Sequence, residues 1–269
     1  MDFLLTKTFN PTHADNKMKQ EGDVAKAREY FIRNKNKNLA FLLDKRYSWM
    51  NDYITNNDLG IEVGAGCGFS KFFIKNKNLL TTDYANHSWL DAANINALEL
   101  PYPNESKDYI IAGNMIHHIP YPLLFFKEMA RVLKPGGVLI IQELYGSYLM
   151  RLILKLMRHE GYDYTVNVWN EKEVCTNPND LWAANCVIPN LLFDNTQVFQ
   201  NNVPQFKIIK KVHTEFFVFL NSGGVIAKTG YLPLPKFALK FLWKLDSILS
   251  KVLPSIFSSQ VQLVLKKWK

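Results

Sequence analysis

Cysteine is scarce in this sequence: only Cys67, Cys175 and Cys186 occur, and they lie far apart. Three widely spaced cysteines form neither a disulfide framework nor a cysteine-based metal motif, so we expect a reducing compartment. No run of about 18 uncharged apolar residues is present, which argues against a membrane span, and residues 1–10 lack the anatomy of a signal peptide. We therefore expect a cytoplasmic protein, and peripheral contact with the inner membrane face stays open.

The chain also lacks internal repeats, low-complexity tracts and a clear linker. Its 269 residues are 48% apolar and 13% aromatic, enough for one large α/β domain with a full core. The net charge of +8 admits an anionic substrate, a membrane surface or nucleic acid as partner, or merely a solvated lysine-rich surface. Because no base-flipping motif or RNA-binding module is visible, we expect no nucleic-acid partner. The sequence leaves the oligomeric state open.

The most informative stretch is a strand over residues 59–63 that leads into glycines at every second position, Gly64, Gly66 and Gly68, with a helix predicted to begin at Phe69. A strand, a glycine-rich turn and a helix in this order are typical of nucleotide-cofactor sites. The glycines permit positive φ and let a ligand approach bare backbone, while the first free N–H groups of the helix favour an anionic group. A glycine turn without any ligand is the alternative.

The spacing distinguishes between cofactors. A dinucleotide fingerprint needs glycine or alanine where Phe69 stands, which argues against an NAD-dependent enzyme. The spacing Glu-x-Gly-x-Gly-x-Gly, from Glu62 to Gly68, resembles motif I of the class I S-adenosyl-L-methionine (SAM) methyltransferases. The resemblance implies SAM as the cofactor, bound by this turn through Glu62, Gly64, Ala65, Gly66 and Gly68.

Four further positions extend this expected cofactor site. A strand over 79–82 ends at Asp83, whose carboxylate can accept hydrogen bonds from both ribose hydroxyls; a turn or cap aspartate is the alternative. Tyr84 follows directly. Asn96 and Ala97 begin a stretch that resembles the one closing over adenine in the family, with Asn96 in the place of the usual aspartate. Its side-chain oxygen can still accept from the adenine amino group, and the N–H of Ala97 would serve the ring nitrogen.

A second motif begins where the strand over 108–112 ends, with Gly-Asn-Met-Ile-His-His-Ile-Pro at 113–120. A helix over 123–133, a Lys-Pro-Gly-Gly stop and a strand over 138–143 follow. In this order the segments resemble the type-11 subgroup of class I methyltransferases over residues 58–144. The resemblance implies an α/β fold with a Rossmann-like, seven-stranded, mostly parallel sheet, helices on both faces and an antiparallel last strand. It also adds Asn114 to the cofactor contacts.

We expect a single domain over 1–269 that has four parts. These are an N-terminal helical cap at 1–57, the SAM-binding core at 58–144, a substrate-side insertion at 145–206, and C-terminal strands with an amphipathic helix at 207–269. We predict helices over 23–34, 39–54, 88–94 and 148–157, and late strands over 206–217 and 260–265. Residues 184–193 resemble a segment in methyltransferases of bacterial surface-polysaccharide clusters.

The chemistry of methyl transfer suggests which side chains meet the acceptor. A hydroxyl acceptor is helped by a general base, and histidine suits this near neutral pH. His117 and His118 follow the strand over 108–112, at the carboxyl edge where ligands bind in open α/β sheets. We predict one of them as the base, with Glu143 and Tyr145 as further substrate-side candidates. No acidic cluster calls for a metal, so none is expected.

We therefore expect a SAM-dependent methyltransferase that O-methylates a sugar, a nucleotide sugar or a surface-glycan precursor, in polysaccharide biosynthesis. Two alternatives stay open: a methyltransferase of another small molecule, such as a quinone-type or N-acceptor, and a SAM-binding module without turnover.

The last feature is the segment 236–253, predicted as an amphipathic helix. Lysines 236, 240, 244 and 251 share one face, and an apolar stripe including Phe237 and Phe241 is expected on the opposite face, against the sheet. Leu239 and Trp243 interrupt the polar face and are expected to point outward. A basic helix with aromatic residues at its border can lie on a membrane, so weak contact with anionic membranes is expected; ordinary packing on the sheet is the alternative.

Overall fold

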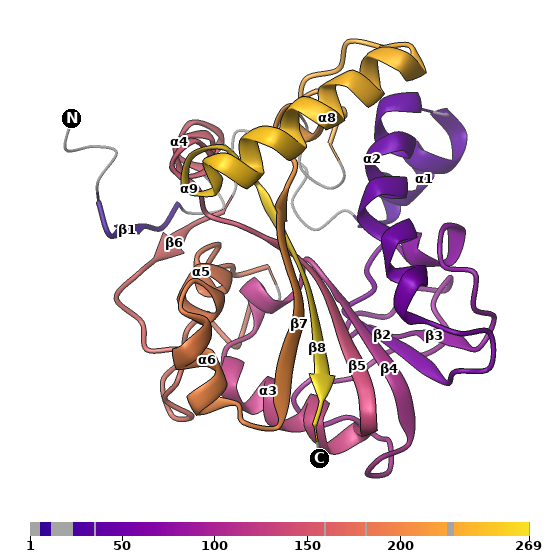
Figure 1. Cartoon of the computed structure of the whole chain (residues 1–269), viewed down its shortest axis with the longest axis vertical. Coiled ribbons are helices and arrows are strands. Elements are labelled where there is room, and N and C mark those ends of the chain that lie inside the picture. Colours follow the sequence, from indigo (N-terminus) through magenta and orange to yellow (C-terminus); the bar gives the residue numbers. More distant parts are fainter. Residues whose placement is uncertain are drawn as a thin grey trace.

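The computed structural model describes residues 6–11, 24–34, 36–158, 160–180, 182–224 and 229–268. Its centre is a six-stranded sheet (Figure 1). From edge to edge the strands are β3 (Leu79–Thr81), β2 (Gly60–Val63), β4 (Lys107–Gly113), β5 (Leu133–Leu144), β8 (Gln260–Lys267) and β7 (Phe206–Thr214). The first four are parallel, whereas β8 runs antiparallel to both neighbours. This confirms the Rossmann-like class and the antiparallel last strand.

The number of strands in this sheet differs from the prediction of seven: six pair among the described residues. A separate two-stranded ribbon joins β1 (Thr8–Phe9) to β6 (Tyr162–Asp163). The predicted helix over 88–94 is also wrong. Those residues form turns and one bridge to Thr82, because the carboxylate of Asp91 is held by the N–H and hydroxyl of Thr81.

Helices cover both faces of the sheet (Figure 1). They are α1 (Val24–Asn34), α2 (Lys37–Tyr47), α3 (Pro122–Val132), α4 (Tyr148–Met157), α5 (Ile188–Phe193), α6 (Thr196–Asn202), α7 (Phe217–Leu220), α8 (Lys236–Val252) and α9 (Pro254–Phe257). Short 3-10 turns are η3 (Ser48–Tyr53), η4 (Phe69–Phe72) and η5 (Ile116–His118). The predicted helix over 39–54 is thus α2 followed by η3, and Asp23 lies outside the described residues.

The helix expected after the glycine turn is only η4. Asn51, from η3, receives the N–H of Lys75 and donates to the carbonyl of Phe73, which draws the chain out of helical geometry after one turn. Phe31 of α1 packs its ring edge against Phe69 at 4.9 Å between centroids. The N-terminal helices therefore occupy space beside the glycine turn.

The central strands are buried on both faces, as a covered parallel sheet requires. Ile110 lies in one apolar core with α3, and Ile111 lies in the other core with α2. Neighbouring residues of one strand thus enter opposite cores, the consequence of the two-residue period of a strand. This rigid centre fixes the loops at the carboxyl ends of β2 and β4.

The orientation predicted for α8 is inverted. Leu239 is buried and Trp243 packs against the core that contains α2, whereas Phe237 and Phe241 are 76% and 71% exposed. The reason is Asp246, whose carboxylate is buried and accepts the N–H groups of 216, 217 and 218 at the start of α7. Among the described residues, no helix combines the length and apolarity that crossing a bilayer needs.

A buried ion pair joins α2 to the end of β7. The guanidinium of Arg46 donates to both carboxylate oxygens of Glu215, at 2.8 to 3.1 Å, and Glu215 has a positive φ of 58°. That conformation ends the strand at Thr214, earlier than the predicted residue 217.

We predict that Arg46→Met destabilises the protein by about 3–5 kcal/mol, because it leaves the Glu215 carboxylate buried without its partner. The double variant Arg46→Met/Glu215→Met should regain most of this loss, since no buried charge remains. Urea denaturation measures both. A single variant that loses under about 1 kcal/mol would contradict the prediction.

Candidate functional site

The glycine turn after β2 has the backbone geometry that its sequence indicates. Gly64, Gly66 and Gly68 all have positive φ, at 65°, 47° and 62°. A Cβ added at Gly64 would lie 2.8 Å from the Cβ of Met115, so glycine is needed there for close packing. At Gly66, by contrast, the same atom would meet only Val24, at 3.9 Å. The turn is therefore closed at Gly64 by the chain itself and open over Gly66.

Asp83 lies beside the open part of this turn. One carboxylate oxygen accepts the N–H of Gly66 at 2.8 Å, and the other accepts that of Ala85 at 2.8 Å. Each oxygen keeps lone-pair capacity for a further donor. Trp89 donates its indole N–H to the carbonyl of Gly66, and the guanidinium of Arg28 lies over the Trp89 ring at 5.3 Å. The predicted ribose-binding carboxylate thus lies at the turn.

Glu62 is wholly enclosed at the end of β2. It is 1% exposed and accepts a short hydrogen bond from the hydroxyl of Ser70. Burial raises the pKa of Glu62 to about 8, against the opposing effect of that hydrogen bond. The carboxyl group holds the start of η4 against the strand and thereby shapes the turn.

The remaining predicted cofactor residues differ in their exposure and in the contacts that they already make. Ala65 and Ala97 are buried and Tyr84 is exposed. The side-chain oxygen of Asn96 already accepts the N–H of Leu98, so any adenine contact would use its second lone pair. Asn114 has a positive φ of 51°, unusual for a residue other than glycine, directly after β4.

Glu143, at the end of β5, is the hub of the loop after β4. Its carboxylate accepts the N–H groups of Met115, Ile116 and Leu144, at 2.7 to 3.0 Å, and contacts Nδ1 of His117 at 2.5 Å. It has no exposed surface. Direct contact between Glu143 and an acceptor stays a prediction; the observed contacts make it a positioning residue for His117.

His117 and His118 lie side by side, with ring centroids 4.2 Å apart. Nδ1 of His117 meets the Glu143 carboxylate, and Nδ1 of His118 meets the carbonyl of Ala183 at 3.0 Å. Both partners can only accept, so each Nδ1 carries hydrogen and each neutral ring has its lone pair at Nε2. Burial lowers the pKa of His117, but the charge of Glu143 raises it, and the net shift of this pKa is upward. Burial lowers the pKa of His118 to about 4.

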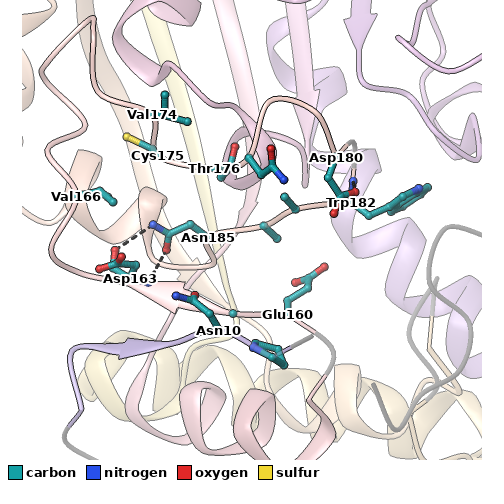
Figure 2. Close-up of a pocket in the computed structure, with 15 residues that line it drawn as sticks. Asn10, Glu160, Asp163, Val166, Val174, Cys175, Thr176, Asp180, Trp182 and Asn185 are labelled. Carbon is teal, nitrogen blue, oxygen red and sulfur yellow. Dashed lines mark hydrogen bonds between the residues drawn. The ribbon is translucent and has the colours of Figure 1, made fainter. Parts of the chain in front are cut away.

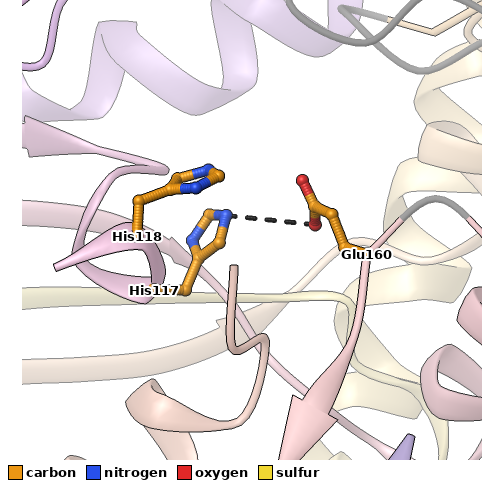
Figure 3. Close-up of side chains that lie close together, drawn as sticks. All are labelled: His117, His118 and Glu160. Atoms are coloured by element: carbon orange, nitrogen blue, oxygen red, sulfur yellow. Dashed lines mark ion pairs between the residues drawn. The ribbon is translucent and has the colours of Figure 1, made fainter. Parts of the chain in front are cut away.

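Glu160 completes this cluster, and nothing in the sequence marked it (Figure 3). One of its carboxylate oxygens lies 4.0 Å from Nε2 of His117 and accepts the thiol hydrogen of Cys186, with sulfur and oxygen 3.1 Å apart. The ligand atoms of His117, His118 and Glu160 all lie within 4.8 Å of one another. Because Glu160 is 43 positions from His117, only the fold brings them together.

A cavity of about 580 Å³ adjoins the cluster (Figure 2). One wall is formed by residues 174–177, 180 and 182–185, which hydrogen bonds attach to the histidine loop: Thr176 donates to the carbonyl of His118, and the N–H of Asn185 donates to that of His117. Glu160 lines the cavity together with Asn10 from the N-terminal segment and Trp182. The predicted substrate-side insertion therefore supplies most of this wall.

Tyr145, the other predicted substrate-side residue, is buried. Its hydroxyl donates to Asp194 at 3.0 Å, and its ring contacts that of His213 edge-on at 4.4 Å. Burial and the charge of Asp194 raise its pKa. These contacts connect β5, α5 and β7, and the contact of Tyr145 with an acceptor stays a prediction.

Residues 63–141 match the family described as "Methyltransferase domain". The chain is 37% identical to a demethylmenaquinone methyltransferase of Bacillus licheniformis, in an alignment of 114 residues that covers 37% of this chain and 48% of that protein. A protein of the same name from Bacillus mycoides is 31% identical, over 38% of this chain and 48% of its own length. The chain thus spans about half the length of the curated relatives it matches.

Among solved structures, a SAM-dependent methyltransferase from Archaeoglobus fulgidus is similar with a TM-score of 0.50 at 13% identity, over 89% of this chain and 99% of that one. The likeness shows the fold. Fold, glycine turn and family match together define a class I, SAM-dependent methyltransferase domain around residues 63–141.

The match indicates SAM as the cofactor, and the residues present fit it. The turn leaves bare backbone open above Gly66, and the Asp83 carboxylate beside it has acceptor capacity left. The two ribose hydroxyls of a bound nucleoside can donate to the Asp83 carboxylate. The part of the ligand next to the ribose needs backbone that no side chain covers, as above Gly66.

We predict that Gly66→Val abolishes SAM binding, because its side chain fills the open space over the turn, and that Asp83→Ala weakens binding about tenfold or more by removing a charged acceptor. Isothermal calorimetry measures both. Gly136→Ala is the matched control, since Gly136 also has positive φ but no neighbour within 4 Å. Unchanged SAM affinity in both turn variants would refute the assignment.

Proposed function

We propose that this protein is a SAM-dependent methyltransferase that transfers the methyl group to a polar, hydroxyl-bearing acceptor. The observation that carries the proposal is the placement of two features at one edge of the sheet. The open glycine turn follows β2, and the histidine loop beside the cavity follows the adjacent strand β4. Ligands of open α/β sheets bind at this edge.

SAM, when bound, supplies a methyl group on a positively charged sulfur, which keeps the electron pair of the broken C–S bond as the acceptor oxygen forms its bond to carbon. The chain's part is to bind, to orient and to exclude water. The turn and Asp83 hold the nucleoside end, and the cavity wall holds the acceptor. The acceptor's hydroxyl proton passes to a base, and the lone pairs at Nε2 of His117 and His118 are basic positions that the histidine loop offers for it.

The acceptor class is proposed from the lining of the cavity. Seven of its side chains are polar or charged: Asn10, Glu160, Asp163, Thr176, Asn177, Asp180 and Asn185. Such a wall, with Trp182 at its side, suits a molecule that offers several hydroxyl groups to carboxylate and amide oxygens. A sugar, a nucleotide sugar or a glycan precursor has this chemistry, in line with the expectation from the sequence.

A second candidate acceptor is a quinone-type ring. The names of the Bacillus relatives support it, since both are called demethylmenaquinone methyltransferases. Those relatives are matched over about half of their length, so the rest of the protein can differ in the acceptor that it holds. A SAM-binding module without turnover is the outcome in which neither acceptor reacts.

The activity is tested by incubating the protein with SAM that carries an isotopic label in its methyl group. Nucleotide sugars, lipid-linked glycans and quinone precursors are offered as separate panels, and product masses are recorded. We expect a labelled product from a hydroxyl-bearing glycan and none with Gly66→Val. Label only in the quinone panel would transfer the proposal to the second candidate, and SAM binding without any product would refute methyl transfer.

We predict that Trp182→Ala raises the KM for the acceptor roughly tenfold and leaves SAM affinity within about threefold, because an aromatic contact of about 1–2 kcal/mol is lost from the cavity wall. Steady-state kinetics with each substrate varied separately measures this. Trp268→Ala, an exposed tryptophan on β8's C-terminal side, is the control and should leave both constants unchanged. Equal losses for SAM and acceptor would contradict the assignment of the cavity.

A further inference from the structure

Two histidines and one glutamate converge beside the cavity in a manner that general acid–base chemistry alone does not require. We propose that Nε2 of His117, Nε2 of His118 and the carboxylate of Glu160 bind one divalent transition-metal ion, which would hold the acceptor's hydroxyl oxygen. Two imidazoles and a carboxylate are a common ligand set for zinc and its first-row neighbours.

The first support is the orientation of the rings. Neighbouring residues on a helical turn normally point apart, yet His117 and His118 present both rings to one side, with centroids 4.2 Å apart. Their Nδ1 atoms are already used by the Glu143 carboxylate and the Ala183 carbonyl. These are the outer partners that metal-bound histidines typically have, because they fix the ring and leave Nε2 for the metal.

The second support is the distance between the donor atoms. Metal–ligand bonds of about 2.0–2.2 Å place ligand atoms roughly 3–3.5 Å from one another. Here Nε2 of His117 and the Glu160 carboxylate are 4.0 Å apart, and one ligand atom from each of the three residues lies within 4.8 Å of the other two. The donor atoms thus lie about an ångström farther apart than in a metal-bound site, a difference that small side-chain movements on metal binding would remove. The thiol of Cys186, whose pKa is raised by burial, donates to this carboxylate and orients it.

The third support is the open side of the cluster. Glu160 lines the cavity, so a fourth ligand position would face the space proposed for the acceptor. Three protein ligands with one open position are typical of catalytic rather than structural metal sites. A metal there would favour release of the acceptor hydroxyl's proton to water while the oxygen attacks the methyl carbon. This role rests on the proposed function, whereas metal binding does not.

The test uses the full chain without SAM or acceptor. Zn²⁺ is titrated by calorimetry, and Co²⁺ is followed by its visible absorption, which reports coordination by nitrogen and oxygen. We expect one ion per chain, with at least tenfold weaker binding in His118→Ala and in Glu160→Gln. The latter keeps the size of the side chain and an acceptor for Cys186. His87→Ala, which removes a histidine outside the cluster, should bind as the parent does.

Circular dichroism confirms that the variants fold. No stoichiometric ion, or equal affinity in the cluster variants and the parent, would overturn the proposal and leave the pair with the base role predicted from the sequence. SAM affinity is measured in the same samples, so that loss of the metal site and failure of the methyltransferase proposal give different results.

A second inference has its own observation, the outward face of α8. Five apolar side chains, spaced three or four residues apart, form an exposed stripe along the helix: Phe237, Phe241, Leu245, Ile248 and Val252. This spacing places them on one face. The helix is held in this orientation by Asp246 and Leu239 on its buried side, so the stripe is fixed toward solvent.

The charges beside the stripe indicate what kind of surface this face binds. Lys236, Lys240, Lys244 and Lys251 are exposed on the same helix, and its single acidic residue, Asp246, is buried. The lysines therefore occupy the solvent-facing side next to the stripe, without a counter-charge on the helix. We infer that this face docks on an anionic membrane, with the aromatic rings among the acyl chains and the lysines at the head groups.

Vesicle co-sedimentation tests this inference. The protein should bind phosphatidylcholine vesicles that contain phosphatidylglycerol and ignore pure phosphatidylcholine, and added salt should weaken binding. We expect at least a tenfold loss in Phe237→Ser/Phe241→Ser and in Lys240→Glu/Lys244→Glu. Trp268→Ser, an exposed aromatic residue directly after β8, is the control, and Figure 1 shows the C-terminal end of β8 far from α8. Binding that the helix variants leave unchanged, or a concentration-dependent dimer that they disrupt without any vesicle binding, would overturn the inference.

Discussion

The arrangement of the site depends on one buried carboxylate. Glu143 has no contact with solvent, yet it accepts three backbone N–H groups and contacts the ring of His117. A buried carboxylate is costly unless its lone pairs are satisfied, and here they are satisfied by Met115, Ile116 and His117 of the loop after β4 and by the N–H of Leu144. The same interactions that stabilise Glu143 therefore fix the path of that loop, and the loop in turn presents both histidines.

Two carboxyl groups, those of Glu62 and Asp83, organise the cofactor side of the same sheet edge. The carboxyl of Glu62 is buried, accepts a hydrogen bond from Ser70 and shapes the turn. The Asp83 carboxylate accepts the N–H of Gly66 and can still accept hydrogen bonds from a ligand. Two carboxyl groups near one turn thus have separate roles, because one is enclosed and the other lies at the open side. Met115 connects the two halves, since it packs against Gly64 and precedes the histidine pair.

The wall of the cavity proposed for the acceptor, by contrast, consists mainly of loops outside the central sheet. The cavity wall includes Glu160 and residues 174–177 and 182–185, and Thr176 and Asn185 join it to the histidine loop by hydrogen bonds. Loops held by a rigid edge are where acceptor specificity can change without loss of the fold. The proposed metal ligand Glu160 and the outward stripe of α8 both belong to parts of the chain outside the matched segment 63–141. They are the features in which this protein can differ from its relatives.

The sequence by itself determined the glycine turn and the central apolar strands, because glycine spacing acts locally and apolar strands show a regular pattern. The parallel order of the sheet and its antiparallel last strand were expected only from the resemblance to class I methyltransferases. The sequence did not determine the length of η4, which Asn51 ends from another element, or the absence of the helix over 88–94, which Asp91 and Thr81 decide. Only the tertiary structure brought Glu160 to His117 and turned Phe237 of α8 outward. An amphipathic pattern shows that two faces differ, but which face is buried depends on where a polar anchor such as Asp246 finds its donors.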